Sequence, residues 1–326
     1  MAEFTLTILG SGSALPMHGR HPSAQLIQYD DFYCLMDCGE GTQERMMAGG
    51  IKPFKISHIL ITHLHGDHVF GLPGLLSSYT HLKRTEELTV YGPIGIKGLL
   101  ESIFTYTELH LTYPIHIFEM EMTELTSIFS HGNIEVLTFP LYHRIACNGY
   151  MIREKFPQIN IQKELINSAH LSIEQIQSLK KGNDIIVDGN VVPCKTFIRN
   201  PAKPISYAYC SDTRYDLRLL SWINEVTVLY HETTFMNDMA VMAELTGHST
   251  AGEAGKIAAA AKVTCLITGH YSSRYKDVGL MLEEARMQFG YVLEAVEGKN
   301  YNLRKLARGL PEGAGEAIKS GKTGNT

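Results

Sequence analysis

The densest group of chemically active side chains lies between residues 63 and 68, where the chain reads His-Leu-His-Gly-Asp-His. Imidazole and carboxylate groups are the ligands that zinc and related divalent metals prefer. A single zinc site rarely takes four ligands so close together, because neighbouring side chains on a tight turn diverge. The segment therefore predicts ligands for two metal ions, against the alternative of a run of surface polar groups on a loop.

Three further candidate ligands each follow an apolar segment that is a predicted strand: His143, Asp212 and His270. Loops after such strands gather at one edge of a sheet, which would bring these side chains to residues 63–68. The candidate metal ligands are then His63, His65, Asp67, His68, His143, Asp212 and His270. Seven ligands suit two zinc ions that share a carboxylate and leave a position open for water. Asp67, between two ligand histidines, fits the role of orienting or deprotonating that water.

The elements that must position these residues follow from the spacing of apolar side chains. Residues 56–62 are the predicted strand that presents the histidine cluster. Other predicted strands span residues 4–9, 24–29, 33–36, 88–91, 115–119, 127–129, 134–139, 205–209, 226–230 and 264–268. Predicted helices span residues 42–48, 73–82, 94–106, 172–180, 249–261 and 280–289. Strands with helices between them predict an α/β fold.

Residues 150–200 differ from the rest of the chain. Within 153–199 there are seven Lys or Arg against five Asp or Glu, a net charge of +2 in a chain whose formal net charge is −5. A basic insertion between two core strands suits an arm that reaches away from the body, although composition equally permits an ordinary surface excursion. We predict one domain over 1–305 with 150–200 as the inserted arm, and a flexible tail over 309–326 that is rich in Gly, Lys and Thr.

The bulk properties limit the location and partners of this 326-residue chain. No apolar run is long enough to span a membrane, and the N-terminus lacks the features of a secretory signal. The six cysteines are scattered without a CxxC pair, so we expect them to be reduced and the protein to be cytoplasmic. The negative net charge does not favour a polyanionic partner, so RNA would require a local basic patch or metal ions.

The His-x-His-x-Asp-His motif with its three downstream ligands resembles the metallo-β-lactamase superfamily. Further segments resemble the ribonuclease Z family, the tRNA 3′-processing endoribonucleases, in its short form. These segments are residues 70–75, 211–213, 231–235, 247–250 and 269–275. The resemblance extends from about residue 4 to about residue 305 and includes an insertion at 150–200, where the short form carries its tRNA-binding exosite arm.

This resemblance implies a four-layer αβ/βα sandwich with a dinuclear zinc site at one edge of the two sheets. It implies that one zinc is held by three histidines and the other by Asp67 with two more histidines, while Asp212 bridges the two ions. The first set is His63, His65 and His143, and the second is Asp67, His68 and His270. Asp67 would also accept a proton from the attacking water.

Two residues outside the ligand set receive roles from the same resemblance. His248 is similar to the family's histidine near the leaving oxygen, which would act as general acid, and Glu232 would orient it. His231 receives no role and is expected to pack. The implied reaction cuts precursor tRNA 3′ of the discriminator nucleotide, leaving a 3′-hydroxyl on the tRNA and a 5′-phosphate on the trailer. The implied assembly is a homodimer in which the arm of one subunit clamps tRNA for the other.

Two positions depart from the family pattern. Many members carry a Pro-x-Lys-x-Arg-Asn loop after the first strand, whereas residues 16–21 here read Pro-Met-His-Gly-Arg-His. The loop lacks the lysine and has His21 in place of asparagine, so the resemblance makes no prediction about discrimination against CCA-bearing tRNA. Thr233 replaces a common alanine, which we expect to be tolerated.

Two other functions remain open from the sequence. One is a different hydrolase on the same metals, such as a small-molecule phosphodiesterase, because one fold serves many reactions. The other is a non-catalytic RNA-binding or scaffold protein, whose mark would be a lost ligand, and none of the seven is missing. Among individual residues, Asp37 either orients a ligand histidine or caps a helix, and Lys180-Lys181 favours a solvated turn. Residues 271–274 either hold the substrate phosphate or pack.

Overall fold

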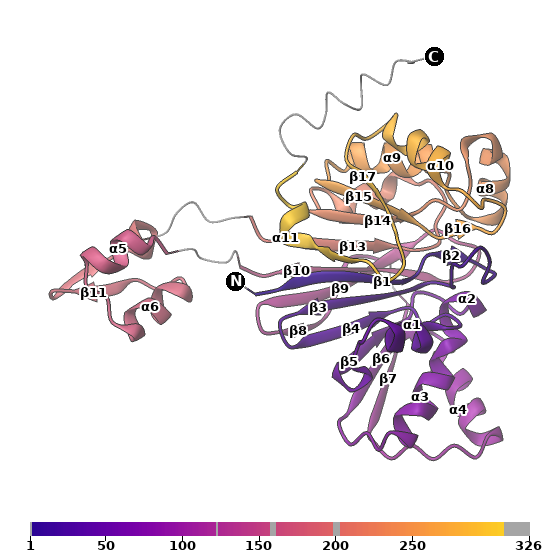
Figure 1. Ribbon diagram of the computed structural model, residues 1–326, viewed down its shortest axis with the longest axis horizontal. Coiled ribbons are helices and arrows are strands. Elements are labelled where there is room, and N and C mark those ends of the chain that lie inside the picture. Colours follow the sequence, from indigo (N-terminus) through magenta and orange to yellow (C-terminus); the bar gives the residue numbers. More distant parts are fainter. Residues whose placement is uncertain (1, 122, 157–160, 198–202, 310–326) are drawn as a thin grey trace.

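Two seven-stranded sheets pack face to face in the computed structural model, which describes residues 2–121, 123–156, 161–197 and 203–309 (Figure 1). The first sheet has the order β18-β1-β3-β4-β5-β6-β7. Its strands are β1 (Phe4–Gly10), β3 (Ala24–Tyr29), β4 (Phe32–Met36), β5 (Ile56–Leu60), β6 (Leu88–Pro93), β7 (Ile115–Met120) and β18 (Asn300–Asn302). Strands β4 to β7 run parallel, so their carboxyl ends meet at one edge of the sheet.

The second sheet has the order β17-β15-β14-β13-β10-β9-β8 and is built in the same way, half parallel and half antiparallel. Its strands are β8 (Thr126–His131), β9 (Ile134–Leu141), β10 (Cys147–Glu154), β13 (Ser206–Cys210), β14 (Val228–Glu232), β15 (Cys265–Gly269) and β17 (Val292–Glu294). Two short pairs complete the described strands: β2 (Gly12–Ser13) with β16 (Tyr271–Ser272), and β11 (Ile185–Val187) with β12 (Asn190–Val192).

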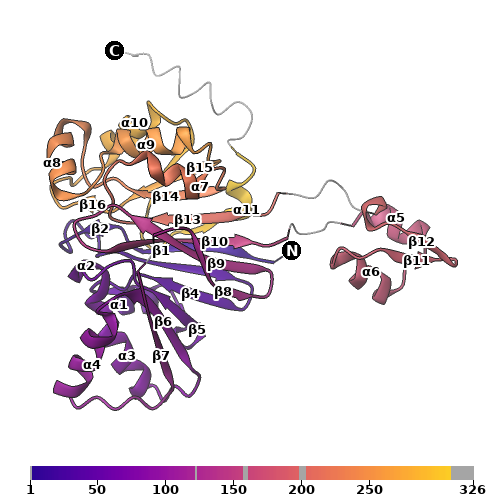
Figure 2. The same cartoon turned by 180° about the vertical axis from the view of Figure 1, so that it is seen from behind.

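Helices cover the outer face of each sheet, which makes four layers (Figures 1 and 2). The first half contributes α1 (Thr42–Ala48), η1 (Pro53–Lys55), α2 (Gly66–Val69), α3 (Gly71–His81) and α4 (Ile96–Tyr106). The second half contributes η3 (Leu217–Leu219), α7 (Leu220–Ile223), η4 (Asn237–Met239), α8 (Ala240–Thr246), α9 (Ala251–Ala260), α10 (Gly279–Arg286) and α11 (Leu303–Leu306). The predicted four-layer αβ/βα sandwich is confirmed.

Side-chain alternation along the strands explains why both faces of each sheet are buried. On β14, Val228 and Tyr230 enter the core between the sheets, whereas Leu229 faces the helices α9 and α10. Helix α9 begins at a capping box, in which the Thr250 hydroxyl accepts from the Glu253 amide and the Glu253 carboxylate accepts from the Thr250 amide. Its Gly255 packs so closely on α10 that an added Cβ would lie 2.6 Å from the Ala285 carbonyl oxygen.

The insertion forms a small unit of its own, with α5 (Lys163–Ser168), α6 (Ile173–Lys180), β11, β12 and η2 (Cys194–Thr196). Its core contains Leu179, Ile185, Cys194 and Phe197. In both views this unit lies beyond one end of the sandwich, while α2 and β2 lie at the opposite end (Figures 1 and 2). The predicted helix over 172–180 is confirmed by α6.

Strand β10 corrects the expected start of the insertion. Residues 147–154 pair with both β9 and β13, so the chain leaves the sheet after Glu154 rather than at 150. The apolar alternation of Tyr150 and Ile152 is partly masked by the charged Arg153-Glu154 that ends the strand. The predicted flexible tail lies, from residue 310 onward, outside the described residues. None of the helices in the described part is both long and apolar enough to cross a membrane.

Candidate active site

The strand β5 and the helix α2 fix the positions of the first four candidate ligands. Beyond Leu60 the chain stays extended, and the Thr62 amide donates to the Asp37 carboxylate at 2.8 Å. His63 and His65 are two residues apart on this extended segment, so their rings can face the same side. At Gly66 the chain turns into α2, which carries Asp67 and His68.

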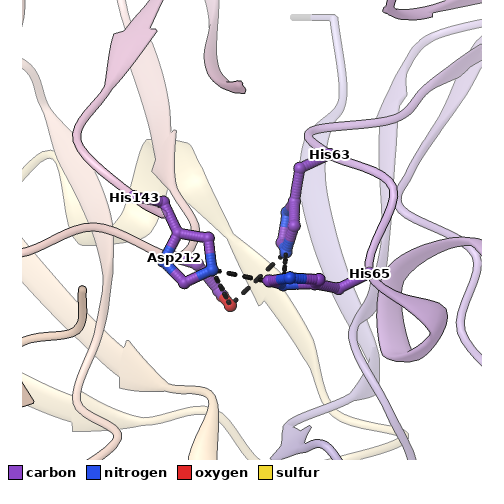
Figure 3. Close-up of side chains that lie close together, drawn as sticks. All are labelled: His63, His65, His143 and Asp212. Atoms are coloured by element: carbon purple, nitrogen blue, oxygen red, sulfur yellow. Dashed lines mark hydrogen bonds and ion pairs between the residues drawn. The ribbon is translucent and has the colours of Figure 1, made fainter. Parts of the chain in front are cut away.

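His63, His65, His143 and Asp212 form the first convergent group (Figure 3). The His63 Nε2 lies 3.0 Å from the His65 Nδ1, and the His143 Nε2 lies 3.2 Å from the same atom. The Asp212 Oδ2 lies 3.5 Å from the His63 Nε2 and 3.8 Å from the His143 Nε2. Side chains from both halves of the sandwich therefore meet at one point.

Asp67, His68 and His270 form the second convergent group. The Nε2 atoms of His68 and His270 are 3.3 Å apart, and each lies 3.5 Å from the Asp67 Oδ2. The other oxygen of Asp212, Oδ1, lies 3.4 Å from the His68 Nε2 and 3.1 Å from the His270 Nε2. One carboxylate therefore faces both groups, one oxygen to each.

These separations fit metal ligands better than they fit hydrogen bonds. Ligand atoms at roughly 2.0–2.1 Å from a tetrahedral zinc are about 3.3 Å from one another, and the nitrogen and oxygen atoms above are 3.0–3.8 Å apart. Two buried imidazole nitrogens that point their electron pairs at each other repel, unless a metal ion or a proton lies between them. The donor set of nitrogen and carboxylate oxygen therefore suits two divalent metal ions.

Hydrogen bonds at the opposite ring nitrogen hold four of the histidines. Such a bond leaves Nε2 free and fixes the ring orientation. The pairs at Nδ1 are His63 with the Thr62 hydroxyl (3.0 Å), His68 with Asp37 (2.8 Å), His143 with the Gly247 carbonyl (2.8 Å) and His270 with the Thr234 hydroxyl (2.8 Å). Each of these four rings is therefore oriented by groups of the protein itself.

Asp37 contacts the ring of the candidate ligand His68 and does not cap a helix. Its carboxylate, wholly buried, accepts from the Tyr209 hydroxyl at 2.8 Å and faces the His68 Nδ1. The helix that begins nearby, α1, has Gly41 at its N-cap and no side-chain cap. The first of the two alternatives from the sequence is therefore the one that the structure shows.

His248 and Glu232 form a pair beside the bridging carboxylate. The His248 Nδ1 lies 2.8 Å from the Glu232 Oε1 and 3.9 Å from the Asp212 Oδ2. Burial alone would lower the pKa of His248, but the Glu232 carboxylate, with a smaller effect of Asp212, outweighs it and raises that pKa to about 9. Glu232 also accepts from the Thr213 and Thr234 amides. The neighbouring His231 is buried, with its Nδ1 near the Glu232 carbonyl.

A cavity of about 370 Å³ opens onto the two groups. It is lined by Ser13, Ala14, Pro22, Glu40, His65, Gly66, Asp67, Phe70, Arg144, Asp212, His248 and His270. Residues 271–274 are not among the lining residues. Tyr271 is buried and donates to the Thr268 carbonyl at 2.7 Å, and the Arg274 guanidinium lies over the Phe235 ring, so packing describes both.

Relatives of known family assign the chain to a family. A ribonuclease Z from Parabacteroides distasonis is 38% identical over 304 residues, which are 93% of this chain and all of that relative. The chain belongs to the ribonuclease Z family. Residues 4–289 of this chain also match the model of a family described as Anti-Pycsar protein Apyc1, so the chain belongs to that family as well.

Solved structures show the same fold as this ribonuclease Z family member. The short form of human tRNase Z superposes with a TM-score of 0.66 at 22% identity, over 92% of this chain and 99% of that one. The metallo-β-lactamase fold protein YhfI from Bacillus subtilis gives 0.65 at 17% identity, over 92% and 99%. The predicted metallo-β-lactamase fold is confirmed.

The sequence missed the groups that support the ligands. Thr62 directly precedes the candidate ligand His63, and Thr234 follows Glu232 by two residues. These positions could have indicated that the two hydroxyls contact histidines of the site. The Gly247 carbonyl and the Ala14 amide, which donates to the Asp67 Oδ2 at 2.8 Å, are backbone groups that carry no side-chain signal.

Proposed function

We propose that this protein is a zinc-dependent endoribonuclease that removes the 3′ trailer from precursor tRNA. It would cut 3′ of the discriminator nucleotide, leaving a 3′-hydroxyl on the tRNA and a 5′-phosphate on the trailer. The observation that carries the proposal is the placement of His248 and Glu232 beside two ligand groups that share Asp212. That placement puts a proton donor next to a site for activated water, as phosphodiester hydrolysis requires.

The metal ligands in this proposal are His63, His65 and His143 for one ion, and Asp67, His68 and His270 for the other, with Asp212 shared. We propose two zinc ions per subunit, because the donor set and the spacing suit zinc. When bound, the two ions supply Lewis-acid activation of water and neutralise the charge on the phosphate. The protein holds four of the five proposed ligand rings in place beforehand through their Nδ1 hydrogen bonds.

Asp67 is the proposed proton acceptor for the attacking water. Burial acts to raise its pKa, but His68 and His270 outweigh burial and hold the pKa well below its ordinary value. The carboxylate is therefore ionised at neutral pH, and the Ala14 amide fixes one of its oxygens. It lines the cavity, so a water bound there can deliver a proton to it.

His248 is the proposed proton donor to the leaving 3′ oxygen. Its raised pKa keeps the ring protonated at neutral pH, and Glu232 fixes its orientation. The oxygen of water bonds to phosphorus, the bond from phosphorus to the tRNA 3′ oxygen breaks, and that oxygen takes the proton. Because Nδ1 faces Glu232, the proton leaves from the opposite nitrogen of the ring.

The insertion is the proposed tRNA-binding arm, and the protein is the proposed homodimer that lets one arm serve the partner's site. The support is geometric: the arm unit lies at the end of the sandwich away from α2 (Figure 1). An arm so placed does not reach the metal site of its own subunit. We also propose a cytoplasmic location, in line with six free, buried cysteines. Cell fractionation that finds the protein elsewhere would contradict it.

The decisive test is cleavage of a 5′-labelled, 3′-extended precursor tRNA by the zinc-loaded protein, with the Asp67→Asn and Asp67→Ala variants alongside. We expect one cut after the discriminator. We expect turnover to fall by about 10² to 10⁴ in both variants, because the proton acceptor is lost. Affinity for the tRNA should change little.

Two results would contradict the proposal. Turnover of a small phosphodiester without any cut in the precursor would mean that the hydrolytic chemistry is right and the macromolecular substrate wrong. Equal loss of binding and turnover in the Asp67→Asn protein would remove the assignment of Asp67 as proton acceptor.

A further inference from the structure

Arg144 stands out among the residues that line the metal cavity, because it is the one Lys or Arg in that lining within the described residues. It comes directly after the candidate ligand His143, in the loop between β9 and β10. Three carboxylates line the same cavity: Glu40, Asp67 and Asp212. Asp67 and Asp212 are proposed metal ligands, so bound ions would offset their charge, whereas Glu40 belongs to neither ligand group and would repel a phosphodiester unless a cation offset it.

The aliphatic part of the Arg144 side chain is packed against a glycine, whereas the residue as a whole is exposed. An added Cβ on Gly247 would lie 3.3 Å from the Arg144 Cγ, so the stem packs against this glycine, whose φ is +74°. Arg144 is exposed, and in the described part of the chain no ion pair or hydrogen bond joins its guanidinium to another residue. By contrast, Arg214 pairs with Glu244 and Arg218 with Asp216.

The loop 16–21 does not supply a cation to this cavity. Arg20 donates to the Tyr275 and Lys276 carbonyls, which draws it toward the segment after β16. His21 faces Glu297, with its Nδ1 2.8 Å from the carboxylate. The part of this region that lines the cavity is Ser13, Ala14 and Pro22, none of which is charged. The arginine that lines the cavity therefore comes from the other half of the sandwich.

We propose that Arg144 is a catalytic residue whose guanidinium binds a non-bridging oxygen of the scissile phosphodiester. The proposal rests on the proposed function, since it names the group that receives the phosphate in that reaction. A guanidinium presents a planar fork of donors that matches phosphate oxygens, and the resulting hydrogen bonds are charge-assisted. Placed beside His143 and His248, it would stabilise the charge that develops on those oxygens as the water attacks.

The test compares Arg144→Gln and Arg144→Lys with the wild type on two substrates, a 3′-extended precursor tRNA and bis(p-nitrophenyl) phosphate. The second substrate carries a single phosphate, so it reports only the scissile group. We expect Arg144→Gln to lower kcat/KM by about 10- to 100-fold on both substrates, and Arg144→Lys to recover part of the loss. The inhibition constant of inorganic phosphate should rise by a similar factor.

The matched control is Arg286→Gln, which removes the same charge from α10, outside the cavity lining, where Arg286 donates to the Val292 carbonyl. We expect it to leave both activities unchanged. Metal content measured by mass spectrometry should be the same in all four proteins. A loss of bound metal in Arg144→Gln would overturn the proposal, because the effect would then act through His143.

Two further outcomes would overturn it. A loss confined to precursor tRNA would place Arg144 against another part of the RNA, and no loss on either substrate would place it outside the reaction. The proposed function fails separately, if the wild type turns over the small diester and leaves the precursor intact. In that case the small diester still decides whether Arg144 binds the scissile phosphate.

Discussion

Glu232 is a buried carboxylate, and its proposed role is to orient the neighbouring His248 and keep it protonated. It accepts from the His248 ring and from the backbone amides of Thr213 and Thr234, so both of its oxygens are engaged. Burial raises its pKa, but His248 outweighs burial and lowers it, so the group is ionised at neutral pH. The pair therefore consists of a carboxylate and an imidazolium, each stabilised by the other.

Replacing Glu232 with glutamine should lower kcat by about 10²-fold with little change in KM, because the amide cannot stabilise the charged His248 ring. A general acid must be protonated to act, so activity should persist up to about pH 9 in the wild type and decline above it. Without the carboxylate the pKa of His248 falls, and this alkaline limb should move to lower pH. Steady-state rates measured across pH test both effects.

The matched control is Glu244→Gln, which removes an exposed carboxylate that pairs with Arg214 on the surface. It should leave both the rate and the alkaline limb unchanged. A Glu232→Gln protein that loses activity while its alkaline limb stays near pH 9 would show that Glu232 supports the fold around His248 without setting its charge. Partial rescue by Glu232→Asp would favour the positioning role.

The arm is attached to the sandwich at the end of β10 and at the start of β13, which lie side by side in the second sheet. The Glu154 amide donates to the Ile205 carbonyl at 2.9 Å, and the Glu154 carboxylate pairs with Arg304. The arm's small core of Leu179, Ile185, Cys194 and Phe197 belongs to the insertion alone. The sandwich therefore does not depend on the arm for its own core.

Replacing residues 157–202 with a short Asn-Gly turn should raise KM for precursor tRNA by at least about tenfold, because phosphate contacts are lost. Turnover of bis(p-nitrophenyl) phosphate and the unfolding temperature should change little. Steady-state kinetics on both substrates check this. If hydrolysis of the small diester disappeared too, the arm would be part of the catalytic body.

The same deletion tests the proposed homodimer. Two chains that are each defective, one without the arm and one carrying Asp67→Ala, should recover cleavage of the precursor when they are co-expressed and purified as a mixed dimer. The recovery comes from the intact site of the first chain and the intact arm of the second. No recovery from a verified mixed dimer would mean that each arm serves its own subunit.

Most elements of the body could be predicted because their apolar spacing is regular. The hairpin of β3 and β4, the strand β5 and the helix α9 lie where residue periodicity placed them. The β11–β12 hairpin was missed, although Asp188-Gly189 between two β-branched segments is a strong turn signal, and both residues have positive φ.

Part of the candidate site was also predictable from residues close together in the chain, whereas the rest depends on contacts between distant segments. The cluster from His63 to His68 is predictable because it is contiguous, and the later ligands because each follows a strand. The contacts that orient them join positions far apart in the chain, such as His143 with Gly247 and His270 with Thr234. Periodicity within one segment cannot indicate which distant backbone group meets a ring, so these partners needed the structure.

The net charge of −5 hides an uneven distribution over the whole molecule. A second cavity, of about 470 Å³, lies beside the strands from which the arm leaves. Its charged lining residues are Lys203, Glu225, Lys262, Arg304 and Arg308. Arg304 is paired with Glu154, so Lys203, Lys262 and Arg308 against Glu225 make a small local basic patch, which is what an RNA partner would require of an acidic chain.

Metal removal should destabilise the whole molecule, because the proposed ligands come from both halves of the sandwich. Without ions, buried groups of like charge or unshared nitrogen atoms face one another across the interface between the sheets. We expect chelation to lower the unfolding temperature by at least about 5 °C, and two equivalents of zinc to restore it. Scanning fluorimetry with metal analysis of the same samples checks both numbers.

In a matched sample of the His143→Ala protein, chelation should lower the unfolding temperature by less, since one proposed ligand is already missing. An unchanged unfolding temperature in the wild type would contradict the proposed ions. Restoration by a single equivalent would contradict the dinuclear site while leaving a metal in place.

In the first sheet, the first strand of the body pairs with the last, because β18 lies at the edge beside β1. Thr5 on β1 lies opposite Asn302 on β18, and Tyr301 lies opposite Leu6. The last proposed ligand, His270, also belongs to the final quarter of the chain. During synthesis, therefore, the ligand set is incomplete until His270 has left the ribosome, and the sheet is incomplete until Asn302 has. A nascent chain that has not yet reached His270 would lack a proposed ligand of one ion.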